Sequence, residues 1–279
     1  MIERILIAVA GLGKCEEMLK MLMEISSIKQ ANVTILHIVP PQITSDEMAE
    51  KLEEGGKILA SAVQNLKLDP ARFTTRLKQG DPKDIVVQIA EKENSDLIIM
   101  GSRGLSRIES ILQNSVSQYV FQLTSRPMLL VKDDVYVKKI NKVMLAYDGS
   151  DSAKESLKLA LFLVRDIKGG QLILTHITSG KEAVAPDKDP VLAYAISEAK
   201  KYGINYKCAG NAGGKPGEEI CRLASELNAD LLLLGSPERR PSVARALPDL
   251  DRLLGNSSSD YVRVYAPCPV LLTRTIANN

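Results

Sequence analysis

Residues 96–102 read DLIIMGS, and residues 230–236 read DLLLLGS. Three more blocks recur in the same order along the chain, which indicates an internal duplication. They are RILIAV at 4–9 against KVMLAY at 142–147, ILHI at 35–38 against LTHI at 174–177, and RPMLLV at 126–131 against CPVLLT at 268–273. The 279 residues suffice for two domains, which we expect at 1–135 and 139–279.

Each repeat alternates short apolar runs with longer amphipathic stretches. The runs 5–9, 33–39 and 97–100 are continuous, which is typical of strands buried on both faces. The stretches 16–28 and 84–93 carry apolar residues at helical spacing. We therefore expect an α/β fold of two tandem doubly wound domains, each with a five-stranded parallel sheet. The expected strands are 4–9, 33–38, 72–78, 96–100, 127–131, 142–147, 171–177, 204–209, 229–234 and 269–273.

The composition argues against nucleic-acid and membrane partners. The 36 basic and 34 acidic residues are intermixed and leave a net charge of +2, so no strongly basic surface is expected. Aromatic residues make up 4% of the chain and tryptophan is absent, which disfavours a base-stacking platform. No apolar run is long enough to span a bilayer, and no signal peptide is expected. These features predict a cytoplasmic protein.

The cysteine pattern agrees with that compartment. No two cysteines form a CxxC pair, and neither histidine stands at metal-ligand spacing from them. We expect buried structural thiols in a reducing compartment and no zinc site. The four cysteines are Cys15, Cys208, Cys221 and Cys268.

The turn after the strand at 96–100 is a candidate ligand site, because open α/β sheets bind ligands beyond the carboxyl ends of their strands. It contains Gly101 and Gly104, and Asn114 and Ser115 follow after nine further residues. Glycines let the backbone approach a phosphate, and Asn114 tolerates the positive φ of a tight turn. Ser115 can cap the next helix, whose free N–H groups suit an anion. The candidate phosphate-binding residues are Gly101, Arg103, Gly104, Asn114, Ser115, Val116 and Ser117.

This spacing resembles the nucleotide signature of the universal stress protein family, which is Gly, two residues, Gly, nine residues, then Gly-Ser or Gly-Thr. Gly101, Gly104 and Ser115 match it, and Asn114 departs from the last glycine. The resemblance covers the whole chain twice, as in a tandem universal stress protein. It implies an adenine nucleotide such as ATP, with Mg²⁺ or Mn²⁺ on the phosphates. It also implies a stress-response regulator without substantial catalytic turnover.

The same resemblance implies residues at the adenine and ribose end. In ATP-binding members an Asp ends the first strand; here the second repeat has Asp148, and the first repeat has Ala10. The hydrophobic residue after the histidine of the second strand maps to Ile38 and Ile177. Asp148 has an equal alternative as the N-cap of a helix that starts near Ser150. The further candidate nucleotide contacts are Val9, Ala10, Ile38, Met100 and Asp148.

The second repeat interrupts the phosphate motif. Glu238 replaces the second glycine, where a carboxylate would repel a polyphosphate. The segment before Asn256-Ser257-Ser258-Ser259 is also eight residues longer than its counterpart. Several backbone contacts to charged phosphate oxygens outweigh one contact from an Asp. We therefore expect the nucleotide mainly in the first repeat.

Simpler interpretations stand beside these. The turn at 101–104 can be only a tight strand-to-helix connection, and Arg103 only a solvated loop charge. His37 and His176 are expected to be core histidines satisfied by the backbone, so no Ser-His-Asp set can be assembled from them. No Walker-type lysine follows the glycines. The alternative function is a scaffold or adaptor that binds no nucleotide, and an enzyme of the wider ATP-using fold group is a third.

Assembly can be predicted from the sheet edges. The strands 127–131 and 269–273 can pair with each other within the chain, as a pseudo-dimer that hides two exposed edges. A homodimer is expected in addition, because most soluble oligomers are symmetric homo-oligomers and dimers are the commonest of them. The regulator is also expected to bind a protein partner, which the sequence does not identify.

Overall fold

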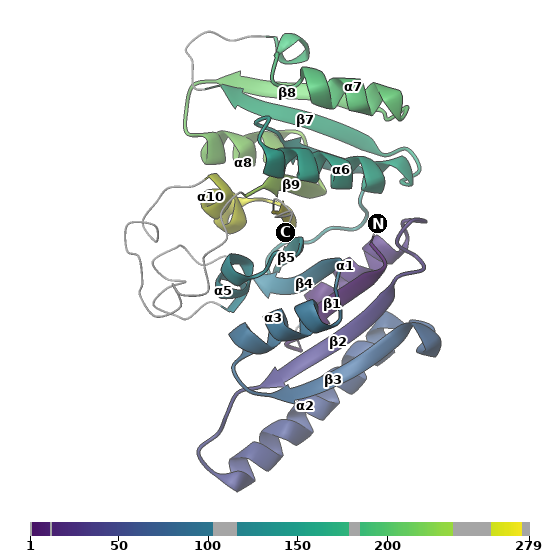
Figure 1. The fold of residues 1–279 in the computed structure, drawn as a ribbon, viewed down its shortest axis with the longest axis vertical. Coiled ribbons are helices and arrows are strands. Elements are labelled where there is room, and N and C mark those ends of the chain that lie inside the picture. The colour runs from purple at the N-terminus through teal and green to yellow at the C-terminus, as the bar shows by residue number, and fades with distance from the viewer. Residues whose placement is uncertain (1, 12, 103–115, 179–184, 237–257, 275–279) are drawn as a thin grey trace.

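The chain folds around one continuous ten-stranded sheet with helices on both faces (Figure 1). The computed structural model describes residues 2–11, 13–102, 116–178, 185–236 and 258–274. The strand order is β3-β2-β1-β4-β5-β10-β9-β6-β7-β8. The two halves of this order are the two sequence repeats, and each is a five-stranded parallel arrangement.

All ten strands predicted from the sequence are present, with ends that differ by three residues or fewer. The elements of the first repeat are β1 (Arg4–Ala8), α1 (Lys14–Met23), β2 (Asn32–Val39), α2 (Ser45–Leu66), a 3₁₀ turn (Pro70–Arg72), β3 (Phe73–Gln79), α3 (Pro82–Lys92), β4 (Leu97–Ser102), α5 (Val116–Leu123) and β5 (Met128–Lys132). Those of the second repeat are β6 (Lys142–Ala146), α6 (Asp151–Arg165), β7 (Gln171–Thr178), a 3₁₀ turn (Pro186–Lys188), α7 (Ala193–Lys201), β8 (Tyr206–Ala212), α8 (Pro216–Glu226), β9 (Leu231–Gly235), α10 (Ser258–Tyr265) and β10 (Val270–Thr273).

The two halves join through β5 and β10, which confirms the predicted pairing within the chain. These two strands run antiparallel with Leu129 opposite Leu271, whereas every other neighbouring pair in the sheet is parallel. The junction pairs one edge strand of each half with the other. Without it, both strands would present unpaired backbone groups. The strands β3 and β8 remain as the two outer edges.

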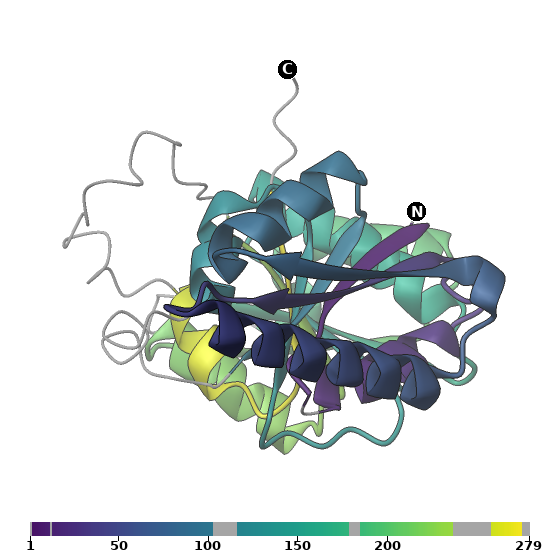
Figure 2. The same ribbon diagram turned by 90° about the horizontal axis from the view of Figure 1, so that it is seen from below.

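The apolar strands are buried on both faces because helices cover both sides of the sheet, as Figure 2 shows. In β4, Leu97 and Ile99 belong to the core under α1 and α6. Ile98 and Met100 belong to the opposite core, under α3, α5, α8 and α10. Successive side chains of a strand point to opposite faces, which explains why these runs are continuously apolar rather than alternating.

The aspartate that opens each DLxxxGS block has a structural role. The Oδ2 atom of Asp96 accepts hydrogen bonds from the backbone N–H groups of Glu3 and Arg4, at 2.9 Å each. Asp230 does the same at the start of β6, with Asn141 at 2.8 Å and Lys142 at 2.7 Å. Each carboxylate therefore aligns the first strand of its repeat with the fourth.

Two helix starts follow a local sequence signal, and one helix ends earlier than predicted. The strand-to-helix turns before α3 and α8 place Pro82 and Pro216 at the first helical positions. The first helix was predicted over 16–28, but α1 ends at Met23. Ile25 and Ile28 nevertheless remain buried, because the chain continues in hydrogen-bonded turns against the same core.

Three of the four cysteines are buried, as the sequence predicted, whereas Cys208 is half-buried; the structure shows all four as free thiols. Within the parts of the chain that the structure describes, no helix is both long and apolar enough to cross a membrane.

Candidate functional site

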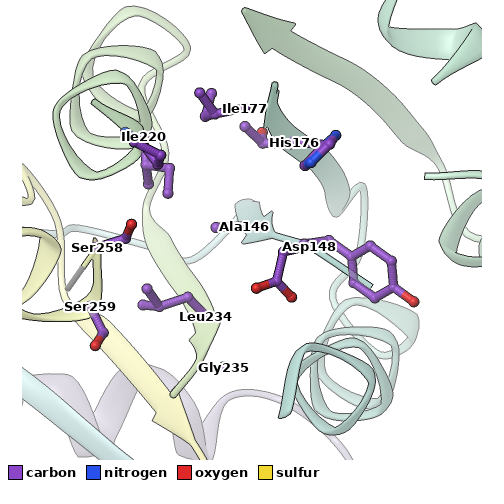
Figure 3. A pocket seen from close by; sticks show the side chains of 12 residues that line it. Ala146, Asp148, His176, Ile177, Ile220, Leu234, Gly235, Ser258 and Ser259 are labelled. Carbon is purple, nitrogen blue, oxygen red and sulfur yellow. The ribbon is translucent and has the colours of Figure 1, made fainter. Parts of the chain in front are cut away.

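A cavity of about 300 Å³ opens at the carboxyl ends of β6 and β9 in the second repeat (Figure 3). Here β6 lies between β7 and β9, and so the strand order reverses at β6. Open α/β sheets bind ligands at this kind of position. The residues that line the cavity are Ala146, Tyr147, Asp148, Thr175, His176, Ile177, Pro216, Ile220, Leu234, Gly235, Ser258 and Ser259.

One part of the cavity wall is apolar. Ile177 comes from β7, Ile220 from α8 and Leu234 from β9, and all three are buried parts of one core cluster. An aliphatic wall of this kind suits a flat ring system, which loses water contact on binding.

The remaining wall is polar. Ser258 and Ser259 form the first turn of α10, and Asp148 lies across the pocket from them, with its carboxylate directed into the cavity (Figure 3). The first backbone N–H groups of a helix have no partner within the helix and favour an anion. The pocket therefore combines a carboxylate acceptor, two hydroxyl groups and a helix N-terminus.

Asp148 is held by the turn that starts α6. Its Oδ1 atom accepts a hydrogen bond from the backbone N–H of Ser150 at 3.0 Å. Ser150 itself is the N-cap of α6, and its Oγ atom accepts from the N–H of Ala153 at 3.2 Å. The alternative interpretation of Asp148 as the helix cap is therefore wrong, because the cap lies two residues later. Asp148 is exposed and supports the turn.

Gly235 marks a close approach of two elements beside the pocket. A Cβ atom at this position would lie 2.4 Å from the carbonyl carbon of Ser152 and 2.5 Å from the nitrogen of Ala153. The glycine thus lets the N-terminus of α6 pack directly onto the end of β9. Gly101 is its equivalent in the first repeat, where the nearest atom to a Cβ is the Sγ of Cys15 at 3.9 Å.

The two histidines occupy equivalent strand positions but have different partners. The Nδ1 atom of His37 lies 2.8 Å from the carbonyl oxygen of Val9, which confirms the prediction that this histidine has a backbone partner. For His176 that prediction is wrong, since its Nδ1 lies 2.7 Å from Oδ2 of Asp189. The carboxylate comes from the connection between β7 and α7, where the two repeats do not match in sequence. His176 and Ile177 point to opposite sides of β7, so the imidazole lies away from the apolar wall (Figure 3).

Burial affects one titratable residue that lines the pocket, Tyr147. Tyr147 is 3% exposed, and burial raises the pKa of its hydroxyl group above the usual value. Its backbone N–H donates to the carbonyl of Thr175 at 2.8 Å, which holds the end of β6 against β7.

The structure places the described candidates of the first repeat at the equivalent edge of its sheet. Val9 and Met100 are buried, and Ile38 is half-buried. Ala10 and Gly101 are exposed at the ends of β1 and β4. Of the remaining candidates, Val116 begins α5 and is half-buried, and Ser117 is buried. The other four, Arg103, Gly104, Asn114 and Ser115, lie outside the described residues.

Several residues of the pocket were not predicted as site residues, although the duplication carried a signal for some of them. When the two repeats are aligned, Val9 corresponds to Tyr147, and Met100 corresponds to Leu234. In the same alignment, Val116 and Ser117 correspond to Ser258 and Ser259. Ile220 had no such signal, because its distance from the strand ends depends on how α8 packs.

Comparison with known proteins identifies the family. The sequence profile described as "Universal stress protein family" matches residues 1–132 and again 139–274. The chain belongs to the universal stress protein family. It carries two universal stress protein domains in tandem.

Individual members of the universal stress protein family show the extent of the likeness. Universal stress protein YxiE of Bacillus subtilis is 26% identical over 148 residues, which cover 47% of this chain and 100% of that protein. The crystal structure of a universal stress protein from Archaeoglobus fulgidus covers 100% of this chain and 98% of that chain, with a TM-score of 0.79 and 22% identity. A universal stress protein in complex with cAMP covers 49% of this chain and 98% of that chain, with a TM-score of 0.36 and 26% identity. The Archaeoglobus structure shows that the fold of the whole chain is shared.

Proposed function

We propose that this protein is a regulator that binds an adenine nucleotide, and that the pocket of the second repeat is one of its binding sites. The observation that carries the proposal is the cavity at the reversal of strand order, with an apolar wall on one side and Asp148 and the N-terminus of α10 on the other. Membership of the universal stress protein family supports it, because the nucleotide signature of that family is recognisable in the first repeat.

The lining residues support one orientation of the ligand. The adenine ring packs against Ile177, Ile220 and Leu234, which are too apolar to bind phosphate. Asp148 accepts a hydrogen bond from a ribose hydroxyl group. The phosphate lies at Ser258 and Ser259, where hydroxyl groups and backbone N–H groups donate to its oxygens.

A divalent ion is proposed only as a companion of the phosphates. Among the described residues no cluster of three or more His, Cys, Asp or Glu side chains could hold a metal. Mg²⁺ commonly keeps several waters and binds through one or two carboxylates together with substrate phosphates. We therefore expect Mg²⁺ or Mn²⁺ to bind with the nucleotide and not in its absence.

The regulator is proposed to act by ligand occupancy, without substantial turnover, in the cytoplasm and as a homodimer. The motif of the first repeat supports a site there as well, which the sequence favours as the main one. Reduced thiols support the cytoplasmic location, since disulfides persist mainly in oxidising compartments.

Binding can be assigned to the second repeat with a fluorescent reporter. The chain contains no tryptophan, so Tyr261→Trp introduces a single one beside the pocket. Tyr261 packs over Gly217, next to the lining residue Pro216. Titration with ATP, AMP and cAMP, each with and without Mg²⁺, should change the tryptophan emission in a saturable way.

Matched variants then test the geometry. Ala146→Leu fills the pocket, and Ala8→Leu makes the same change at the equivalent position of the first repeat. We expect the reporter signal to disappear with the first variant and to remain with the second. Asp148→Ala should weaken binding about tenfold or more, because a hydrogen bond to a charged group contributes about 1.5–3 kcal/mol.

Calorimetry separates the alternatives. Gly104→Glu copies the interrupted loop of the second repeat into the first, so a loss of binding stoichiometry in this variant would assign a site to the first repeat. No heat with any nucleotide at millimolar concentration would favour the adaptor instead. Substantial release of phosphate from ATP would favour an enzyme.

A further inference from the structure

Two basic residues cross the junction between the repeats at equivalent positions. Lys132 ends β5 and Arg274 follows β10, and these two strands pair antiparallel. Lys132 Nζ donates to the carbonyl of Ala266, just after α10, at 3.3 Å. Arg274 Nη2 donates to the carbonyl of Phe121, in the last turn of α5, at 2.5 Å. Each cation therefore stabilises the C-terminal end of a helix in the other repeat.

Arg274 makes further contacts that lead to the pocket. Its Nη1 atom donates to both the carbonyl oxygen and the Oγ of Ser236, at 3.3 Å each. Ser259 Oγ in turn donates to Ser236 Oγ at 3.4 Å. Since Ser259 lines the pocket, a short chain of side-chain contacts joins Arg274 to the polar wall. The second side-chain contact of Lys132 is instead with the exposed Asp134, at 3.9 Å.

The environment of Arg274 fixes its orientation. The side chain is 5% exposed, and its guanidinium carbon lies 3.9 Å from the ring centroid of Phe121. A guanidinium group is planar and has several donors at fixed angles, so stacking on the ring determines where the other donors point. Phe121 in α5 thus orients the donors that reach Ser236 in the second repeat.

We propose that Arg274 is a positioning residue for the pocket of the second repeat. It holds Ser236 and, through it, Ser259 at the N-terminus of α10, while it is itself anchored on Phe121 of the first repeat. Nucleotide affinity in the second repeat then depends on the first repeat, although Arg274 does not line the pocket. This role rests on the function proposed above.

The test compares two substitutions at the equivalent positions, each in the Tyr261→Trp background. Arg274→Met and Lys132→Met both replace a long cationic side chain across the junction with a long apolar one. Nucleotide titration gives the dissociation constant at the second repeat, and urea unfolding gives the stability of the same samples. We expect both variants to unfold at lower urea concentration, and only Arg274→Met to weaken nucleotide binding, by about tenfold.

Phe121→Leu provides a second measurement if Arg274→Met does not fold. It leaves Arg274 in place but removes the ring on which the guanidinium group stacks. We expect weaker nucleotide binding at the second repeat from this change in the first repeat. Arg274→Lys, which retains the charge and loses the planar group, should restore stability more fully than affinity.

Two results would overturn this role while the proposed function stands. One is an unchanged dissociation constant in both Arg274→Met and Phe121→Leu. The other is an equal loss of affinity in Lys132→Met, which would show a general effect of the junction. If the Tyr261→Trp parent binds no nucleotide in calorimetry, the proposed function and this role fail together.

Discussion

The Nδ1 atom of His176 lies 2.7 Å from Oδ2 of Asp189, a residue that is 6% exposed. The other carboxylate oxygen of Asp189 accepts from the backbone N–H of Val191 at 2.9 Å, two residues before α7 begins. One buried carboxylate therefore ties the end of β7 to the start of α7. In the first repeat, the partner of the equivalent histidine, His37, is a backbone carbonyl. The helix that follows it, α2, is 22 residues long, whereas α7 has nine residues.

Asp189→Ala should lower the free energy of unfolding by about 1–3 kcal/mol, because His176 and the N–H of Val191 lose their acceptor in a buried place. Asp187→Ala is the matched control, since Asp187 is exposed two residues earlier, and it should change stability by less than about 0.5 kcal/mol. Urea unfolding monitored by circular dichroism measures both. Equal effects of the two variants would show that the contact with His176 contributes nothing.

Gly235→Ala and Gly101→Ala should differ although they are equivalent in sequence. The new methyl group at 235 meets the backbone of Ser152 and Ala153 at 2.4–2.5 Å, and backbone atoms cannot move aside cheaply. We expect a loss of about 1–3 kcal/mol there and an effect within about 0.5 kcal/mol at Gly101. Urea unfolding of both variants checks this, and a large loss at Gly101 would contradict it.

Ser156 and Thr273 form a buried hydroxyl pair, with their oxygens 2.5 Å apart, and Thr273 also donates to the carbonyl of Ser152 at 3.1 Å. Thr273→Val alone should cost about 1–3 kcal/mol, because it leaves the Ser156 hydroxyl group without that partner in the core. Adding Ser156→Ala should recover part of the loss. A double-mutant cycle from urea unfolding gives the coupling, and additive losses would mean that the two hydroxyl groups act independently.

The buried thiols should make the protein sensitive to alkali. Burial raises the pKa of Cys15, Cys221 and Cys268 from 9.0 to about 12 in each case. The folded state therefore holds these protons more tightly than the unfolded state does. Their contribution to stability is complete below pH 9 and is lost as the pH rises towards 12.

Between these pH values, each such thiol should lower the free energy of unfolding by about 1.4 kcal/mol for every unit by which the pH rises. Urea unfolding at several pH values between 8 and 11 measures this slope. Cys15→Ala and Cys268→Ala should each unfold with a shallower pH dependence than the parent protein. Because lysines and tyrosines titrate in the same range, only the difference between variant and parent is informative.

The duplicated architecture could be predicted because its signals are local. Continuous apolar runs reveal strands buried on both faces, and Pro82 and Pro216 mark the helix starts. The family motif predicted a site at the carboxyl ends of the strands, because parallel strands bring these ends together at one side of a sheet. The family resemblance indicated Asp148 and Ile177 in the pocket of the second repeat, but not Ile220, which comes from α8.

The amino-acid sequence by itself determined the two tandem α/β repeats, their ten strands and their family. Hydrophobic pattern and repetition are properties of short stretches of sequence, so they can be recognised without knowing any long-range contact. Only the tertiary structure decided that His176 meets Asp189, that Gly235 accommodates α6, and that Arg274 crosses to Phe121. Arg274 and Phe121 are 153 positions apart, and no spacing in the sequence records a contact that forms only when two helices and two strands pack together.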